Sequence, residues 1–114
     1  MTTIYKICGR DEWRAAEGDG QFLGSPVDSR DGFIHFSSAA QVVETATKHF
    51  GTQTDLILIA VDAAALGPSL RWERSRNDDL FPHLYGPLPL AAVRWVKPLP
   101  DEVEGKRTFP ELTP

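Results

Sequence analysis

The sequence predicts one α+β domain built from short strands and two short helices. The run from Leu56 to Val61 is continuously apolar and of strand length, which is typical of a central strand buried on both faces. Val42, Ala46 and Phe50 recur at i, i+4 and i+8, the spacing of one helix face. A chain of 114 residues fits one domain and needs no disulfide framework, and its single cysteine could not form one.

Strand and helix signals alternate in the N-terminal half. We expect a strand over residues 3–7, a helix over 11–17, a short strand over 21–23, a polar loop over 26–32 and a strand over 32–36. Trp13 and Ala16 share one face of the expected helix. Gly18 and Gly20 end it, because glycine takes the left-handed conformation that closes a helix.

A second helix is expected directly after the strand over 32–36. Ser38 is its expected cap, since Gln41 stands three residues on, where a capping box requires a glutamine or glutamate. Val43 is expected to join the apolar face, and Gly51 ends the helix.

Prolines divide the C-terminal half, in which further strands are expected over 56–61, 70–73 and 90–97. Pro82, Pro87 and Pro89 favour an ordered loop over residues 81–89 rather than a helix or a central strand. Residues 1–100 then form the domain. Residues 101–114 have little apolar content and no periodic spacing of apolar residues, so we expect a mobile or loosely docked tail.

Charge and composition limit the classes of partner. The net charge of −4 disfavours bulk nucleic-acid or anionic-membrane binding. Arg71, Arg74 and Arg76 form either a local basic cluster or a solvated edge. No stretch reaches the roughly 20 apolar residues of a membrane span, and the first residues do not resemble a signal peptide. We therefore expect a cytoplasmic protein.

The first candidate site segment is Gly-Phe-Ile-His-Phe-Ser-Ser, residues 32–38. It is expected to be a strand that leads into a helix start, where free backbone N–H groups favour anions and polar ligands. His35 beside such an end is a candidate ligand-binding group, and Ser37 would brace it. The alternative is a structural histidine with serines that only cap the helix.

The second candidate segment is Leu-Phe-Pro-His-Leu-Tyr-Gly-Pro-Leu, residues 80–88. A rigid, apolar loop that carries His83 and Tyr85 is typical of the wall of a site. Alternatively, Phe81, Leu84 and Tyr85 cover the core and His83 has no function.

A third segment is Arg71-Trp72-Glu73. Alternation predicts a buried Trp72, with Glu73 facing out as an acid, a base, a ribose-hydroxyl acceptor or half of a surface ion pair. The three histidines and Cys8 lie at no short-range ligand spacing, so we expect no metal site. No glycine-rich phosphate loop is present in the sequence.

Taken together, these segments resemble a known family. The strings Ile-Tyr-Lys-Ile at 4–7, Gly-Phe-Ile-His-Phe-Ser-Ser at 32–38, Leu-Arg-Trp-Glu at 70–73 and Phe-Pro-His-Leu-Tyr-Gly-Pro-Leu at 81–88 look like the small bacterial family called domain of unknown function 952. The resemblance covers residues 3–99 in order, and the Phe-Pro-His-Leu-Tyr-Gly string is its specific part.

That family in turn resembles the ADP-ribosyltransferase-like fold superfamily. The resemblance implies a small ADP-ribosylation-like fold, with mixed or antiparallel strands in two packed sheets and two short helices. In such enzymes a first strand bears a His or Arg, and a later strand of the Gly-x-Tyr-Phe-Ser type opens a helix. Lys6 stands at the first place and His35 at the usual tyrosine. The third motif supplies a glutamate, and His83 lies in that region instead, which departs from the pattern of a working transferase.

The resemblance implies a pocket for a small-molecule nucleotide, either NAD or an ADP-ribose-like molecule. NAD would be a substrate, and no covalently bound cofactor is expected. In this hypothesis His35 and His83 are the catalytic residues of an ADP-ribosyltransferase-like transferase. The substrate-binding residues are Lys6, Ser37, Glu73 and Tyr85. The alternatives are a non-catalytic binding or interaction module with a degenerate site, whose protein partner the sequence does not specify, and a metal-dependent hydrolase.

Overall fold

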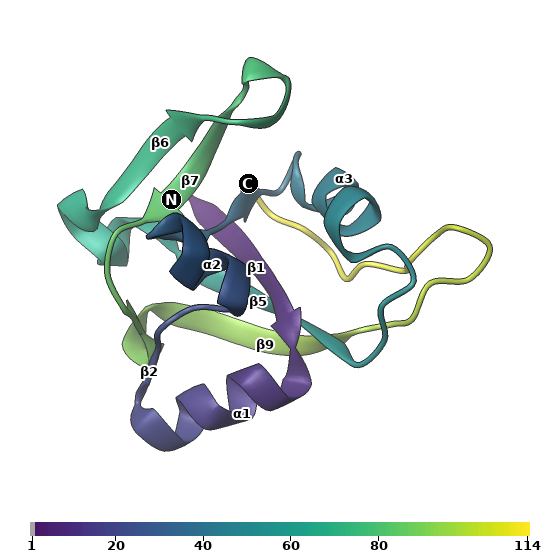
Figure 1. Ribbon diagram of the computed structural model, residues 1–114, viewed down its shortest axis with the longest axis horizontal. Helices are drawn as coiled ribbons and strands as arrows, with labels where there is room; N and C mark the ends of the chain where they lie inside the picture. Colours follow the sequence, from purple (N-terminus) through teal and green to yellow (C-terminus); the bar gives the residue numbers. More distant parts are fainter. Residues whose placement is uncertain (1) are drawn as a thin grey trace.

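The computed structural model describes residues 2–114 as an α+β fold with three antiparallel sheets (Figure 1). The strands are β1 (Thr3–Gly9), β2 (Gln21–Phe22), β3 (Ile34–His35), β4 (Ser37–Ser38), β5 (Leu56–Asp62), β6 (Leu70–Arg74), β7 (Leu80–Leu84), β8 (Leu88–Pro89) and β9 (Val93–Leu99). The helices are α1 (Arg10–Asp19), α2 (Pro26–Asp31) and α3 (Val42–Thr45), with a π turn η1 (Ala46–Phe50) and 3-10 turns η2 (Ala63–Ser69), η3 (Arg76–Asp78) and η4 (Leu90–Ala92). The predicted α+β class is confirmed.

The largest sheet has the strand order β4-β1-β5-β9, so β5 lies inside it between β1 and β9. Leu58 and Ile59 are both 0% exposed. Because they face opposite sides of the sheet, both faces of β5 must be covered. The predicted central strand is therefore confirmed.

Two apolar clusters cover the faces of this sheet. One cluster combines β1 and β5 with α1, β2, β3 and β7, through Ile4, Cys8, Trp13, Phe22, Ile34, Ile57, Ile59 and Leu84. The other combines them with α3, η1 and the C-terminal segment, through Tyr5, Ile7, Val42, Ala46, Leu56, Leu58, Phe109 and Leu112. The four-stranded sheet is thus the middle layer of the molecule.

Residues 34–38 join this sheet to the three-stranded sheet of order β3-β7-β6. His35 pairs with His83 of β7, whereas Ser37 pairs with Tyr5 of β1. Between them, Phe36 donates its backbone N–H to the Pro82 carbonyl at 3.0 Å. The nitrogen and oxygen of a strand residue face the same neighbour, and Pro82 has no N–H to donate in return. Pairing with β7 ends at this point and the chain crosses to β1.

The segment expected to be a polar loop over 26–32 is in fact the helix α2. Ser25 precedes it, Pro26 occupies the first turn, and Gly32 closes it in the left-handed conformation with φ 87°. Asp28 accepts a hydrogen bond from the Ser25 N–H at 2.8 Å. These residues form a capping arrangement that stabilises a helix too short to show an apolar period.

The expected cap of the second helix is also corrected. Ser38 belongs to β4, and α3 begins only after Gln41. Gln41 does reach back, because its Oε1 accepts from the Ser38 N–H at 3.0 Å. Val42 and Ala46 are buried as predicted, but Val43 is exposed.

The proline-rich segment departs most from expectation. Residues 80–84 are not a loop but the middle strand of the three-stranded sheet, paired with β3 and β6. The strand expected over 90–97 begins at Val93 and extends to Leu99. Trp72, expected to be buried, is 42% exposed.

The C-terminal segment runs beside α3 (Figure 1). The Tyr5 hydroxyl donates to the Thr113 carbonyl and accepts from the Thr113 N–H, both at 2.9 Å. Arg107 donates to the carbonyls of Gly51 and Gln53. The expected mobility of this tail stays a prediction. Across residues 2–114, no helix combines the length and the apolar character that crossing a membrane requires.

Candidate functional site

A pocket of about 410 Å³ opens where the two larger sheets meet. It is bounded by β1, β3, β4 and β7, by α2, α3 and η1, and by the β6–β7 turn at η3. All three histidines of the chain, His35, His49 and His83, line it. The strand switch at Phe36 creates this place, because it brings β3 and β4 to the two sheets in succession.

His35 lies on β3 between two carboxylates. Its Nδ1 is 2.6 Å from Asp28 Oδ1, and its Nε2 is 2.9 Å from Asp31 Oδ2. Both ring nitrogens donate at once only in the imidazolium form. The two contacts hold the ring in place at the edge of the pocket.

Asp28 is the centre of this network and is only 2% exposed. Its carboxylate accepts from Lys6 Nζ at 2.9 and 3.0 Å and from the His35 backbone N–H at 3.1 Å. Burial alone would raise the pKa of Asp28, but the hydrogen bonds from His35 and Lys6 and the Lys6 charge lower that pKa to about 2. The ionised carboxylate thus ties β1, α2 and β3 together.

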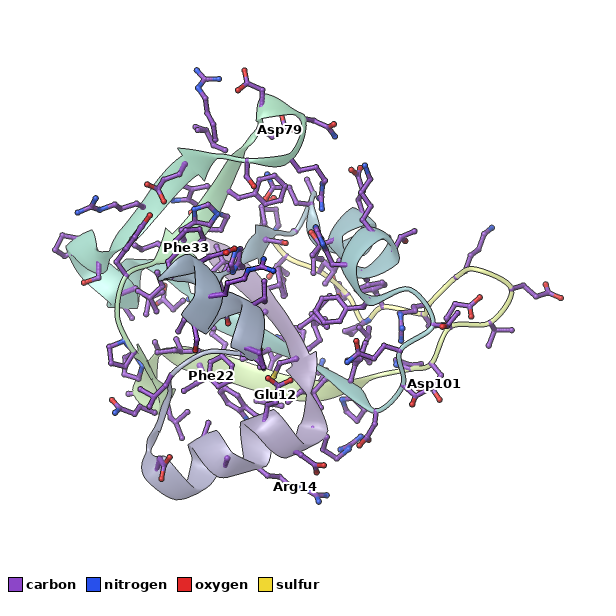
Figure 2. All side chains as sticks on the ribbon, viewed as in Figure 1. Glu12, Arg14, Phe22, Phe33, Asp79 and Asp101 are labelled. Carbon is purple, nitrogen blue, oxygen red and sulfur yellow. The ribbon has the colours of Figure 1, made fainter. Side chains whose placement is uncertain are left out.

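His83 lies on β7 and is buried, with its ring stacked on Phe33 at 4.1 Å between ring centroids. Phe33 is labelled in Figure 2 beside α2 and the β6–β7 hairpin. His83 Nδ1 is 2.9 Å from Glu73 Oε1, which also accepts from the Tyr85 hydroxyl at 2.7 Å. Those two hydrogen bonds, from Tyr85 first and His83 second, lower the pKa of Glu73.

This pairing decides which ring nitrogen of His83 is available to a ligand. An ionised Glu73 accepts the proton of Nδ1, which leaves Nε2 with its lone pair. Glu73 does not line the pocket, whereas His83 does. Nε2 is then the ring nitrogen that remains to accept a hydrogen bond or a proton.

The two imidazoles of His35 and His83 converge, with 5.6 Å between ring centroids and an edge-on arrangement. They are a cross-strand pair, and Phe33 contacts both rings. Such a pair, with one ring held between two carboxylates and the other bonded to a third, places two groups capable of proton transfer next to each other.

Four of the six predicted site residues line the pocket: Lys6, His35, Ser37 and His83. Glu73 and Tyr85 do not, since they lie behind His83. Ser37 was expected to brace His35, but its Oγ bonds to Thr45 Oγ1 at 2.8 Å. Tyr85 was expected to bind the substrate, but it packs between Phe33 and the Arg71 guanidinium.

Several lining or supporting residues did not emerge as site residues from the sequence. Asp28 and Asp31 were assigned to a polar loop, although Ser25 and Asp28 carry the capping signal that would have placed them on a helix. His49 was noted only for its distance from His35 in the sequence. Arg76 had been read only as one member of a basic cluster.

Two other chemistries are not favoured. Cys8 is buried, and burial, together with the negative charge of Glu12, raises its pKa to about 12, so it is not a nucleophilic thiolate. Within residues 2–114, no group of three His, Cys, Asp or Glu side chains is arranged to hold a metal ion.

Comparison with known proteins identifies the family but names no activity. A family model described as a protein of unknown function, DUF952, matches residues 7–96. The crystal structure of protein CC0527 from Caulobacter crescentus is 48% identical, with a TM-score of 0.90 over 94% of each chain. A crystal structure of its double mutant is 46% identical, with a TM-score of 0.89 over 94% of each chain. Its solution NMR structure is 48% identical, with a TM-score of 0.81 over 94% of this chain and 91% of that one.

The descriptions of these structures mention no ligand or reaction, and no curated protein matches this chain. Nothing in them bears on the expected kinship with ADP-ribosyltransferases. The family resemblance predicted from the sequence is confirmed by a model that spans most of the chain. The chain belongs to the DUF952 family.

Proposed function

We propose that the pocket binds a nucleotide of the NAD or ADP-ribose class, and that His83 accepts a hydrogen bond from a hydroxyl of that ligand. The observation that carries the proposal is the Glu73–His83 pair, in which Glu73 occupies Nδ1 of a histidine that lines the pocket. A carboxylate behind an imidazole fixes its tautomer and its orientation. A ribose is the hydroxyl-bearing part that such a ligand offers.

His35 supplies the complementary charge. Its ring lies 5.6 Å from that of His83 and is held by two carboxylates, so it stays in place when a ligand enters. In its protonated form, His35 attracts the negatively charged phosphates of such a ligand. Lys6 acts through Asp28, and Glu73 and Tyr85 act through His83, so these three are positioning residues in this proposal.

The corresponding reaction is transfer of an ADP-ribosyl group. The bond between the ribose and nicotinamide breaks, and nicotinamide leaves with the electron pair. An acceptor hydroxyl forms the new bond to the ribose, and its proton passes to His83 Nε2. His83 is suited to this step, because imidazole takes up protons near neutral pH.

A non-catalytic binding module is the second candidate, and one observation favours it. Among the described residues, Asp31 is the only acidic side chain that lines the pocket, and it is already bonded to His35 and Arg30. The glutamate that steadies the sugar in the transferases that this family resembles has no counterpart in the lining. Binding without turnover is the outcome that this candidate predicts.

A thermal-shift series tests the proposal, with NAD, ADP-ribose, nicotinamide and an RNA 2′-phosphate mimic. A ligand at 100 times its Kd stabilises by about 2.7 kcal/mol, which is about 10 °C for a chain of this size. His83→Ala and Glu73→Gln should lose the shift while the unliganded Tm changes by only a few degrees. Glu17→Gln, on the exposed face of α1, is the matched control and should behave as wild type.

The outcomes separate the candidates. Nicotinamide release from NAD, measured by chromatography and lost in His83→Ala, supports the transferase. A thermal shift without release supports the binding module. If none of the four ligands raises the Tm, or if His83→Ala keeps the full shift, the proposed function is wrong.

A further inference from the structure

The charge of the pocket is opposite to that of the whole chain. The chain has 12 Lys and Arg against 16 Asp and Glu. The pocket lining has one acidic residue, Asp31, and six basic ones, which are Lys6, Arg30, His35, His49, Arg76 and His83. A pocket whose lining has more basic than acidic residues, in a protein that is acidic as a whole, favours an anionic ligand.

Most of these basic groups already have acidic partners. Lys6 binds Asp28, Arg30 binds Asp31, and His83 binds Glu73. At the end formed by η3 and η1, Arg76 uses only its Nε for an acidic partner, Glu44.

Arg76 is held in a fixed orientation. Its Nε is 3.1 Å from Glu44 Oε1, its Nη2 donates to Thr45 Oγ1 at 3.2 Å, and its guanidinium lies 4.8 Å from the Phe81 ring centroid. The side chain is only 16% exposed. No side chain or carbonyl of residues 2–114 bonds to its Nη1. The side chain is thus pre-organised, with a donor left for a ligand.

His49 reports the electrostatic potential at this end of the pocket. Partial burial lowers its pKa, and the nearby positive charges of Arg76, His35 and Lys48 lower it further. Glu44 is the acidic side chain at this end, and it is shared between Arg76 and Lys48. Positive potential that disfavours a second cation favours an anion.

We infer that the Arg76–His49 end of the pocket is a subsite for a phosphoryl group. The inference rests on the proposed function and deepens it, because it orients the ligand with its phosphate at η3 and its hydroxyl at His83. The remaining Nη1 of the guanidinium can donate a charge-assisted hydrogen bond to a phosphate oxygen. Ser75, which carries a hydroxyl, also lines this end.

The test uses pyrophosphate as the probe, with adenosine as the phosphate-free ligand and acetate as the carboxylate. Binding is measured by isothermal titration calorimetry at low salt on the full chain. Wild type should bind pyrophosphate more tightly than acetate. Arg76→Gln should weaken pyrophosphate binding by about tenfold, as expected for loss of a charge-assisted bond. Arg14→Gln removes the same charge from α1, at the far end of the molecule from the β6–β7 hairpin, and should bind as wild type (Figure 2).

A second variant guards against a purely structural effect of Arg76. Glu44→Gln removes the acidic partner of Arg76 and leaves the cation in place, so it should tighten pyrophosphate binding. If Arg76 had only a structural role, loss of its contact with Glu44 would not tighten pyrophosphate binding. Circular dichroism of each variant confirms that it is folded.

Failure of this inference is distinguishable from failure of the proposed function. If Arg76→Gln binds pyrophosphate as wild type does, or wild type binds none, the subsite is refuted, whatever ADP-ribose does. If pyrophosphate binding depends on Arg76 but no nucleotide binds, the phosphoryl subsite stands and the nucleotide proposal falls. Binding of adenosine without binding of pyrophosphate would indicate a neutral ligand and would overturn the inference.

Discussion

Replacing Asp28 by Asn removes the negative charge on which the His35 network is built. Asp28 and Lys6 are 2% and 5% exposed, so the substitution leaves an ammonium group in the interior without its partner. Breaking a buried ion pair by removing one member costs about 3–5 kcal/mol. For a domain of this size, that lowers the Tm by about 10–20 °C.

The pH dependence gives a second estimate for the same carboxylate. Its pKa is about 2 in the folded protein against an ordinary 3.8, which corresponds to about 2 kcal/mol of stabilisation by the ionised form. Because the folded-state pKa is the lower one, this contribution is complete above about pH 4 and is lost as the pH falls through about 2.

Urea denaturation of wild type, Asp28→Asn and the control Asp11→Asn, at pH 7 and again near pH 3, measures both effects. Asp11 lies exposed on α1. Adding Lys6→Met to Asp28→Asn should restore part of the lost stability, because it removes the unpaired charge. If Asp28→Asn is as stable as Asp11→Asn, or if Lys6→Met restores nothing, the network does not contribute as described.

Three further predictions concern the fold. Leu58→Ala should lower the free energy of unfolding by about 2–5 kcal/mol in urea, because its side chain is fully buried on β5, and a loss below about 1 kcal/mol would contradict that placement. Gln41→Ala should lower the stability measured by thermal unfolding by about 1 kcal/mol, because the Gln41 amide bridges the start of α3 to β7. Ser38→Ala should cost clearly less, and a larger loss in Ser38→Ala than in Gln41→Ala would restore Ser38 as the cap. Tyr5→Phe removes the hydroxyl that binds both backbone groups of Thr113. Trypsin should therefore cleave the C-terminal segment faster than in wild type. Equal cleavage rates would show that this contact does not hold the C-terminal segment.

The sequence was informative wherever the structural signal is local and repeated. The six apolar residues from Leu56 to Val61 specify a buried strand several times over, so the prediction was correct. The six-residue helix α2 has no room for an apolar period, and its only signals stand at its two ends, at Ser25, Pro26 and Gly32. A polar composition there was mistaken for a loop, and Asp28 was missed with it.

The proline rule failed at β7 for a reason that lies elsewhere in the chain. A proline disrupts a central strand only where its missing N–H would have had an acceptor. Pro82 stands opposite Phe36, where the neighbouring strand departs for the other sheet. The sequence placed His35 and His83 in one pocket only when the two candidate segments, residues 32–38 and 80–88, were considered together. The place of Glu73 behind His83 depends on the register of the β6–β7 hairpin, in which Glu73 pairs with Phe81 and Arg71 pairs with His83.

The strand switch at Phe36 also bears on how the molecule fluctuates. A segment whose consecutive residues belong to two sheets couples their opening, since neither sheet can separate without breaking the backbone contacts of residues 34–38. Amide hydrogens of β1 and β7 should therefore exchange with solvent deuterium as one cooperative unit, with similar protection factors. The walls of the pocket that carry Lys6, His35 and His83 would then form one rigid frame. Amide exchange rates that differ from those of β1 and β7 would be confined to α2 and the hairpin turn at η3.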